Sequence, residues 1–212
     1  MFMNKIIWGW IASAAFLALI LLVYTDNIEW FDQPFFAVFK SVPLLAHFSI
    51  IGSELVIGTF SIILILWLGF KDRNFVGILF TVLAIGGGNL VNKFLKSAVE
   101  RERPQALHGE EGFSFPSGHA MVGLIFMLVL AFFISQMISS EKGKLAVYAA
   151  AVSLALLTGI SRTVDSAHFP SDILAGFLIG FSYYLLCEYV YLKLKNIFIK
   201  KMNHKSGLSP YS

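Results

Sequence analysis

Charged side chains are scarce in this sequence of 212 residues. Only 14% of the residues are charged, whereas 57% are hydrophobic. A water-soluble domain of this length could not bury so much apolar surface, so the composition excludes an ordinary soluble enzyme and indicates a protein of the lipid bilayer. The formal net charge of +3 is too small to indicate a nucleic-acid partner.

Cysteine is almost absent as well. Cys187, the one cysteine, lies inside an apolar run, which excludes an intramolecular disulfide and favours an inert, packed thiol. Internal repeats and low-complexity linkers are also missing. We therefore expect a single integral membrane domain over residues 1–212, ending in a short basic cytoplasmic tail at 193–212.

Long apolar runs, by contrast, are abundant. About twenty apolar residues cross the hydrocarbon core as a helix. The stretches that qualify are roughly Ile6–Tyr24, Ile51–Phe70, Phe75–Phe94, Ala120–Met137, Leu145–Ile160 (extendable to Val164) and Ile173–Leu192. The predicted fold class is therefore all-α, a polytopic membrane protein with six transmembrane helices.

The segment between the first two predicted spans is aromatic and contains Pro34 and Pro43. These prolines interrupt it too often for a membrane span, so we expect short interfacial helices that lie on the outer leaflet.

Lysine and arginine set the expected orientation. With a cytoplasmic N-terminus, the inner loops and the C-terminal tail hold most of the 16 basic residues, as the positive-inside rule requires. We expect a multi-pass protein of the plasma membrane with both termini in the cytoplasm. All the remaining basic residues except Lys40 lie near the outer ends of the third and fifth spans or in the third outer segment.

Three polar segments fall together on the extracytoplasmic side in this topology, at the ends of the third to sixth spans. They are KSAVERERP at 96–104, PSGH at 116–119 and SRTVDSAHFPSD at 161–172. The convergence follows from the order of spans and charges alone.

The side chains of these segments suit a phosphate group. Lys96, Arg103 and Arg162 are fixed cations, and an arginine fork matches phosphate oxygens. A proline at 116 fits the first turn of a helix, so we expect the backbone N–H groups of residues 117–119 to point at the site, as helix N-termini do when they bind anions.

His168 and Asp172 stand four residues apart at the start of the sixth span. A carboxylate there can accept the Nδ1–H of the imidazole and leave Nε2 as a nucleophile or base. His119 supplies a second imidazole. Phosphoryl transfer needs an anion clamp, an in-line nucleophile and a proton donor, and these segments supply all three; no further cluster of metal ligands is evident in the sequence.

The patterns K-x6-RP, PSGH and SR-x5-H-x3-D match, in order, the three signatures of the type 2 phosphatidic acid phosphatase family, also called lipid phosphate phosphatases. The sequence resembles this family at every signature position. Bacterial acid phosphatases and vanadium haloperoxidases belong to the same superfamily.

The resemblance implies a role for each matched residue. The residues implied to bind the phosphoryl oxygens are Lys96, Arg103, Ser117, Gly118 and Arg162. His168 is implied to attack phosphorus and form a phosphohistidine, with Asp172 orienting it. His119 is implied to protonate the leaving lipid oxygen and then activate water. The resemblance also implies no metal or other cofactor, a lipid phosphate substrate among membrane lipids, and no obligate protein partner.

Phosphatidylglycerophosphate and undecaprenyl diphosphate are the leading substrates for a bacterial relative of this size, and the sequence does not decide between them. We expect the lipid tail to enter sideways between helices. Two other classes stay open. A transporter needs polar groups along the depth of its spans, which look bare here. A non-catalytic lipid-phosphate binder would be expected to lack His168 or His119. A vanadate-holding haloperoxidase is expected to be soluble.

Several charged residues lie outside the signature positions. We expect Glu54 to pair with a cation of the site and Glu188 to reach lipid headgroups or a lysine of the tail. Those expected to be solvated loop charges are Glu100, Arg101, Glu102, Glu110, Glu111 and Asp165. The loop 105–115, with His108, is expected to overhang the site and shape substrate choice.

Overall fold

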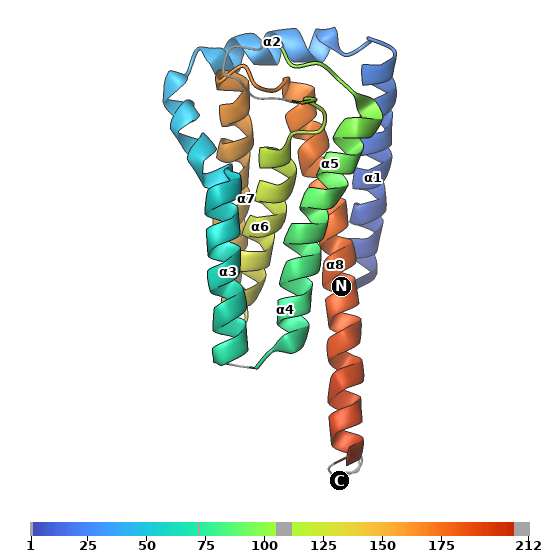
Figure 1. Ribbon diagram of the computed structural model, residues 1–212, viewed down its shortest axis with the longest axis vertical. Coiled ribbons are helices and arrows are strands. Elements are labelled where there is room, and N and C mark those ends of the chain that lie inside the picture. The colour runs from blue at the N-terminus through green and yellow to red at the C-terminus, as the bar shows by residue number, and fades with distance from the viewer. Residues whose placement is uncertain (1, 72, 105–111, 206–212) are drawn as a thin grey trace.

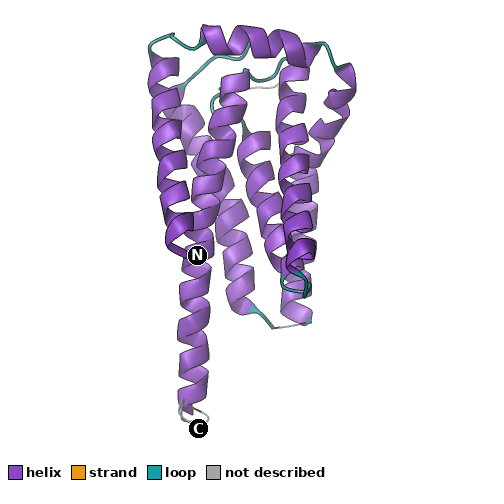
Figure 2. Cartoon of the chain, turned by 180° about the vertical axis from the view of Figure 1, so that it is seen from behind, coloured by secondary structure: helices purple, strands orange, loops and turns teal. Residues whose placement is uncertain are grey.

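The computed structural model of the protein describes residues 2–71, 73–104 and 112–205, and within these ranges it consists of helices and loops without a strand (Figure 2). The elements are α1 (Phe2–Tyr24), α2 (Glu29–Lys40), the 3-10 helix η1 (Pro43–Gly52), α3 (Glu54–Phe70), α4 (Phe75–Thr81), the π-helical turn η2 (Val82–Gly86), α5 (Gly87–Val99), α6 (Gly118–Ser135), α7 (Glu141–Val164) and α8 (Pro170–Lys205). The elements α4, η2 and α5 follow one another without a loop and form one rod.

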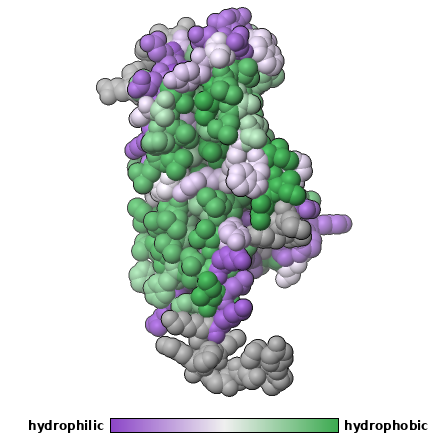
Figure 3. Space-filling model, turned by 90° about the vertical axis from the view of Figure 1, so that its right-hand side faces the viewer, coloured by the Kyte–Doolittle hydropathy of each residue, from purple (hydrophilic) through white to green (hydrophobic). Residues whose placement is uncertain are grey.

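The predicted polytopic, all-α fold is confirmed. Five helical segments are long and apolar enough to cross a membrane: Asn4–Tyr24, Phe75–Val99, Gly118–Ser135, Glu141–Val164 and Pro170–Lys200. The apolar helix α3, which corresponds to the predicted second span, is shorter. Apolar side chains form a broad band between hydrophilic ends of the molecule (Figure 3).

Serine caps move two of the predicted boundaries. The second span begins at Glu54 instead of Ile51 because Ser53 Oγ accepts the backbone N–H of Val56 at 3.3 Å and starts α3 there. The fifth span ends at Val164, as the predicted extension allowed, but begins earlier than predicted, at Glu141, because Ser140 Oγ accepts the N–H of Gly143 at 3.0 Å. The helix of the sixth predicted span, α8, continues to Lys205. The start of the predicted basic tail is therefore helical and extends beyond the bundle (Figure 1).

α2 lies across one end of the bundle, over the ends of α7 and α8 (Figure 1). The prediction that Pro34 interrupts this segment is wrong, because Pro34 lies inside α2. A proline inside a helix removes one hydrogen bond and crowds the carbonyl group of the preceding turn, yet α2 continues through this position. The break comes at Pro43, where η1 begins, and the axes of α2 and η1 meet at 103°.

α6 is the central helix: 72% of its membrane-length window is buried, compared with 17–39% in the other four windows. α8 packs directly on its backbone. A Cβ atom at Gly176 would lie 2.7 Å from the carbonyl oxygen of Ser117, and one at Gly180 would lie 2.8 Å from that of Met121. Glycine at these two positions therefore brings the second and third polar segments into contact.

Candidate active site

The three polar segments meet at the end of the bundle that α2 covers. A cavity of about 580 Å³ opens there between α3, the α4–α5 rod and α6. The predicted site residues that line it are Lys96, Arg103, Gly118, His119 and His168. Glu54 lines the same cavity, so it lies in the neighbourhood of the cations with which we expected it to pair.

Arg103 reaches the cavity from the segment that follows α5. Glu100, in the left-handed conformation with φ 54°, ends that helix and turns the chain toward the third polar segment. Arg103 Nη1 donates to the carbonyl oxygen of Ala167 at 2.8 Å and lies 3.4 Å from His168 Nε2. Burial lowers the pKa of the Arg103 guanidinium, and the negative charge of Asp172 opposes that shift.

His168 is 2% exposed, and its two ring nitrogens face different groups. A guanidinium only donates hydrogen bonds, so the nitrogen that faces Arg103, Nε2, carries the lone pair. The proton is then on Nδ1, which lies 3.5 Å from Asp172 Oδ2, longer than a formed hydrogen bond. Burial lowers the pKa of His168 to about 4, with Asp172 opposing the shift and Lys96 and Arg103 adding to it. The ring is therefore neutral at pH 7.

Asp172 is fully buried, and each of its oxygens accepts at least one hydrogen bond. Its Oδ2 accepts the backbone N–H of Phe169 at 2.9 Å, and its Oδ1 accepts Arg101 Nη1 at 2.6 Å. Its backbone carbonyl accepts the N–H of Ser117 at 3.0 Å. This last bond corrects one prediction, because the Ser117 N–H points at α8 and is not available to an anion.

The helix that the second polar segment starts begins later in the chain than predicted. α6 begins at Gly118 with Ser117 as its N-cap, so Pro116 precedes the cap and is not in the first turn. Ser117 is fully buried and does not line the cavity, whereas Gly118 does. The N-terminal turn that faces the cavity therefore presents Gly118 and His119.

Arg162 supports the loop that carries His168. Its carbonyl oxygen accepts the backbone N–H groups of Ala167 at 3.0 Å and His168 at 3.2 Å, and its Nη1 donates to Asp165 Oδ2 at 3.0 Å. Asp165, predicted to be a solvated loop charge, keeps 24% of its side-chain surface exposed while it pairs with Arg162. The buried Arg162 is not among the residues that line the cavity.

The ring of His119 is held from the side by the end of η1. A Cβ atom at Gly52 would lie 2.9 Å from His119 Cδ2 and 2.3 Å from Thr158 Cγ2, so only glycine fits between them. η1 thus packs its last residue against the second imidazole. The sequence contains no pattern that assigns Gly52 to the site.

Asn92 is a site residue that sequence reasoning missed. It is buried in α5, lines the cavity, and donates from Nδ2 to the carbonyl oxygen of Pro116 at 3.1 Å. This bond fixes the second polar segment against α5. The sequence does contain a signal for this residue: Asn92 stands one helical turn before Lys96, and the two side chains therefore lie on the same face of the helix.

Arg101 was predicted to be a solvated loop charge, and that prediction is wrong. Its side chain is 14% exposed and donates to Asp172 Oδ1 and to Asp32 Oδ2, at 2.6 and 2.7 Å. The prediction for Glu188 is also wrong, since its carboxylate pairs with Lys5 at 2.8 Å. Cys187 is buried and free, as predicted. His108, Glu110 and Glu111 lie outside the described residues.

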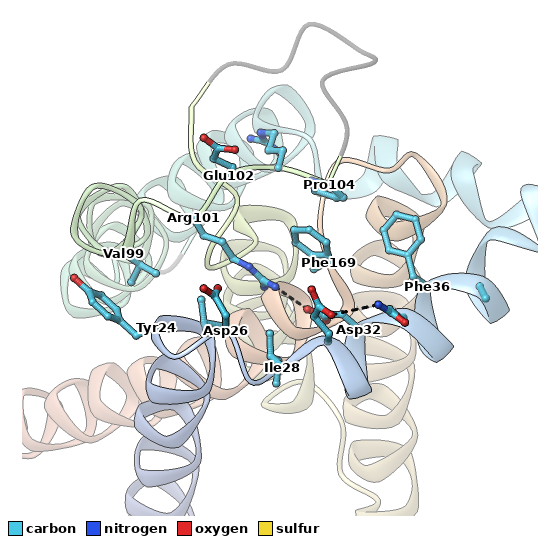
Figure 4. Close-up of a pocket in the computed structure, with 15 residues that line it drawn as sticks. Tyr24, Asp26, Ile28, Asp32, Phe36, Val99, Arg101, Glu102, Pro104 and Phe169 are labelled. Carbon is cyan, nitrogen blue, oxygen red and sulfur yellow. Dashed lines mark hydrogen bonds and ion pairs between the residues drawn. The ribbon is translucent and has the colours of Figure 1, made fainter.

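A larger cavity, of about 860 Å³, lies beside the first at the same end of the molecule. Side chains of α1, α2 and the segment 99–104 surround it, among them Tyr24, Asp26 and Glu102 (Figure 4). Arg103 lines both cavities. Among the described residues, no group of three His, Cys, Asp or Glu side chains is placed to hold a metal ion.

Comparison with known proteins identifies relatives of this arrangement. The family model of the PAP2 superfamily matches residues 75–196. The chain is 32% identical to phosphatidylglycerophosphatase B of Bacillus subtilis over 182 residues, which are 82% of this chain and 89% of that protein. It is 33% identical over 132 residues to a lipid A 1-phosphatase of Rhizobium etli, covering 57% of this chain and 52% of that relative.

Solved structures agree with these matches. The crystal structure of the transmembrane PAP2 type phosphatidylglycerolphosphate phosphatase from Bacillus subtilis superposes with a TM-score of 0.79 at 28% identity, covering 87% of this chain and 96% of that one. The structure of LpxE from Aquifex aeolicus superposes with a TM-score of 0.55 at 24% identity, covering 76% and 94%, which shows a shared fold.

Proposed function

Because the chain belongs to the PAP2 superfamily and is thus a multi-pass membrane phosphatase, we propose that it releases phosphate from a lipid at the extracytoplasmic face of the plasma membrane. The proposed reactions are phosphatidylglycerophosphate to phosphatidylglycerol, undecaprenyl diphosphate to undecaprenyl phosphate, or both. The relative named phosphatidylglycerophosphatase B, which this chain matches over most of its length, supports the first.

The observation that carries the proposal is the placement of His168. His168 lines the cavity, its Nε2 lies 3.4 Å from Arg103 Nη1, and its Nδ1 faces the carboxylate of Asp172. In the proposed first step, Nε2 attacks the substrate phosphorus as the bond from phosphorus to the lipid oxygen breaks. A phosphohistidine forms, and Asp172 stabilises the positive charge that develops on the ring.

His119 completes the proton balance. In its protonated form it donates a proton to the leaving lipid oxygen, and the alcohol or lipid monophosphate departs. The neutral imidazole then takes a proton from a water molecule, which attacks the phosphohistidine and releases inorganic phosphate. This role is supported by the position of His119 in the first turn of α6, on the same cavity as His168.

The proposed phosphate cradle consists of Lys96, Arg103, Arg162 and the first turn of α6 at Gly118. Lys96 and Arg103 lie on the cavity wall, and the N-terminus of α6 adds its helix dipole. Arg162 would act from beneath the His168 loop. Ser117 would contribute as the N-cap that sets the start of α6.

The lipid tail is proposed to leave the cavity between α3 and the α4–α5 rod. Ile57 and Gly58 of α3 and Ile85 of η2 line the cavity on that side. An apolar wall of this kind suits an acyl or prenyl chain, whereas the cations sit at the polar end. Basic residues in the opposite loops and in α8 support an orientation with both termini in the cytoplasm.

The proposal is tested by phosphate release from the detergent-purified protein, with a chelator present, on phosphatidylglycerophosphate, undecaprenyl diphosphate and lysophosphatidic acid. Release that is lost in His168→Ala, while that variant still elutes as a folded species, supports the phosphohistidine mechanism. The ranking of kcat/KM then names the preferred lipid. Substantial turnover by His168→Ala rejects His168 as the nucleophile, and a strict need for Mg²⁺ rejects the metal-free mechanism.

A further inference from the structure

α2 supplies a buried carboxylate to the same end of the molecule. The side chain of Asp32 is 6% exposed, and it accepts the backbone N–H of Ser171 at Oδ1, at 2.8 Å. Its Oδ2 accepts Ser171 Oγ at 2.8 Å and Arg101 Nη2 at 2.7 Å. Asp32 therefore caps the first turn of α8, the turn that carries Asp172, although it comes from a distant helix.

Arg101 joins this carboxylate to the proposed catalytic one. Its Nη2 bonds Asp32, while its Nη1 donates to Asp172 Oδ1 at 2.6 Å and to Ser171 Oγ at 2.7 Å. The guanidinium carbon lies 4.1 Å from the centre of the Phe169 ring, which covers it. Figure 4 shows Arg101 extending toward Asp32 beside the Phe169 ring. Planar geometry lets one arginine hold two carboxylates at once.

The charges alternate along this line of side chains. Asp172 is negative, Arg101 positive and Asp32 negative, and His168 becomes positive when it accepts the phosphoryl group. With Oδ1 of Asp172 bonded to Arg101, its Oδ2 is directed at the N–H of Phe169 and toward His168 Nδ1. Without Asp32, the whole charge of Arg101 would act on Asp172 alone and draw its carboxylate away from the imidazole.

We propose that Asp32 and Arg101 are positioning residues for the reaction: Arg101 orients Asp172 toward His168, and Asp32 holds Arg101 in place. The proposal rests on the proposed function, because it takes Asp172 as the partner of the nucleophile. It makes α2, the helix across the end of the bundle, a part of the catalytic apparatus. Neither Asp32 nor Arg101 lines the cavity that Lys96, His119 and His168 line.

The test compares Asp32→Asn with the wild-type protein in detergent. Asparagine keeps an oxygen that can accept a hydrogen bond from Ser171, but it removes the negative charge that binds Arg101 opposite Asp172. We expect kcat to fall about tenfold or more, while KM and the inhibition constant of inorganic phosphate change by less than about twofold. Arg101→Lys should give the same pattern, because one ammonium cannot hold both carboxylates. Glu29→Gln, which removes an exposed charge from the same helix, should behave as the wild type.

A purely structural role is separated by measuring the thermal midpoint of each variant and referring kcat to the folded, monodisperse fraction. Near-wild-type kcat in Asp32→Asn and Arg101→Lys, beside an inactive His168→Ala, would overturn the positioning role and leave the phosphohistidine mechanism intact. A loss that matches the unfolded fraction, or that appears in KM and phosphate inhibition instead of kcat, would also overturn it. An active His168→Ala would instead reject the mechanism itself.

Discussion

Replacing Gly52 with alanine should reduce both stability and turnover, and the structure gives the size of each effect. The new Cβ would lie 2.3 Å from Thr158 Cγ2 and 2.9 Å from His119 Cδ2. Carbon atoms in contact prefer about 3.5 Å or more, so the overlaps are about 1.2 and 0.6 Å. Overpacking of this kind costs about 1–3 kcal/mol of unfolding free energy, or roughly 2–12 °C in Tm.

The effect on turnover follows from the second overlap. An imidazole displaced by about half an ångström to one ångström from its productive position loses about tenfold to hundredfold in kcat. The two effects separate in the double variant Gly52→Ala/Thr158→Ser, which removes the Cγ2 that makes the worse contact. We expect the double variant to regain most of the lost Tm and to keep much of the loss in kcat.

The assay is phosphate release from the substrate that the wild-type protein prefers, with Tm measured in the same detergent. Gly86→Ala is the matched control, because a Cβ at Gly86 meets nothing within 4 Å. A Gly52→Ala variant with unchanged kcat and Tm would refute the reasoning. A double variant that recovers stability and full turnover would show that Thr158, and not contact with His119, transmits the effect.

Three further predictions concern charge. Arg162→Lys should lower kcat/KM by about tenfold or more, the effect of losing about one charge-assisted hydrogen bond, because an ammonium cannot reproduce the two-pronged geometry of a guanidinium. Near-normal steady-state kinetics would argue against a role of Arg162 in binding phosphate. Because the pKa of His168 is lowered to about 4 from an ordinary 6.5, an unfolded chain takes up its proton first, so stability should fall as the pH drops from about 6.5 toward 4. Thermal midpoints at several pH values should show a smaller fall in His168→Ala, and an equal fall would contradict a neutral buried ring. Glu188→Met should cost about 1–2 kcal/mol, because Lys5 is partly exposed and can turn to water, and Lys5→Met/Glu188→Met should recover part of this in thermal denaturation; no recovery would show that the charges do not act as a pair.

The sequence predicted the elements of the fold well because apolar length determines them. The six apolar stretches correspond to helices, since a membrane span needs only length and hydropathy to be recognised. Boundaries were less accurate where a cap decides them, as at Ser53 and Ser140. These signals are local and readable, because a serine followed by an acidic residue marks a helix start in both cases.

The site was predicted only as far as its linear signatures extend. His119, His168 and Lys96 are brought to one cavity as expected. Contacts between distant segments were missed, because pairing between residues far apart in the chain leaves no periodic signal. Arg101 illustrates this, since a charge in the sequence ERERP looks like any loop charge until α2 brings Asp32 to it.

The packing of α8 on α6 has a consequence for the range of lipids. His119 and Asp172 belong to two helices, α6 and α8, whose backbones touch at Gly176 and Gly180. The apolar side of the cavity belongs to other elements, α3 and the α4–α5 rod. The rod also carries Lys96 and Asn92, so it must stay in place. The size of α3 side chains such as Ile57 can change to admit thicker or thinner tails without altering the distances at phosphorus. Tail selectivity and catalytic rate are separable properties in such a protein, and each can be changed by substitutions that leave the other unchanged.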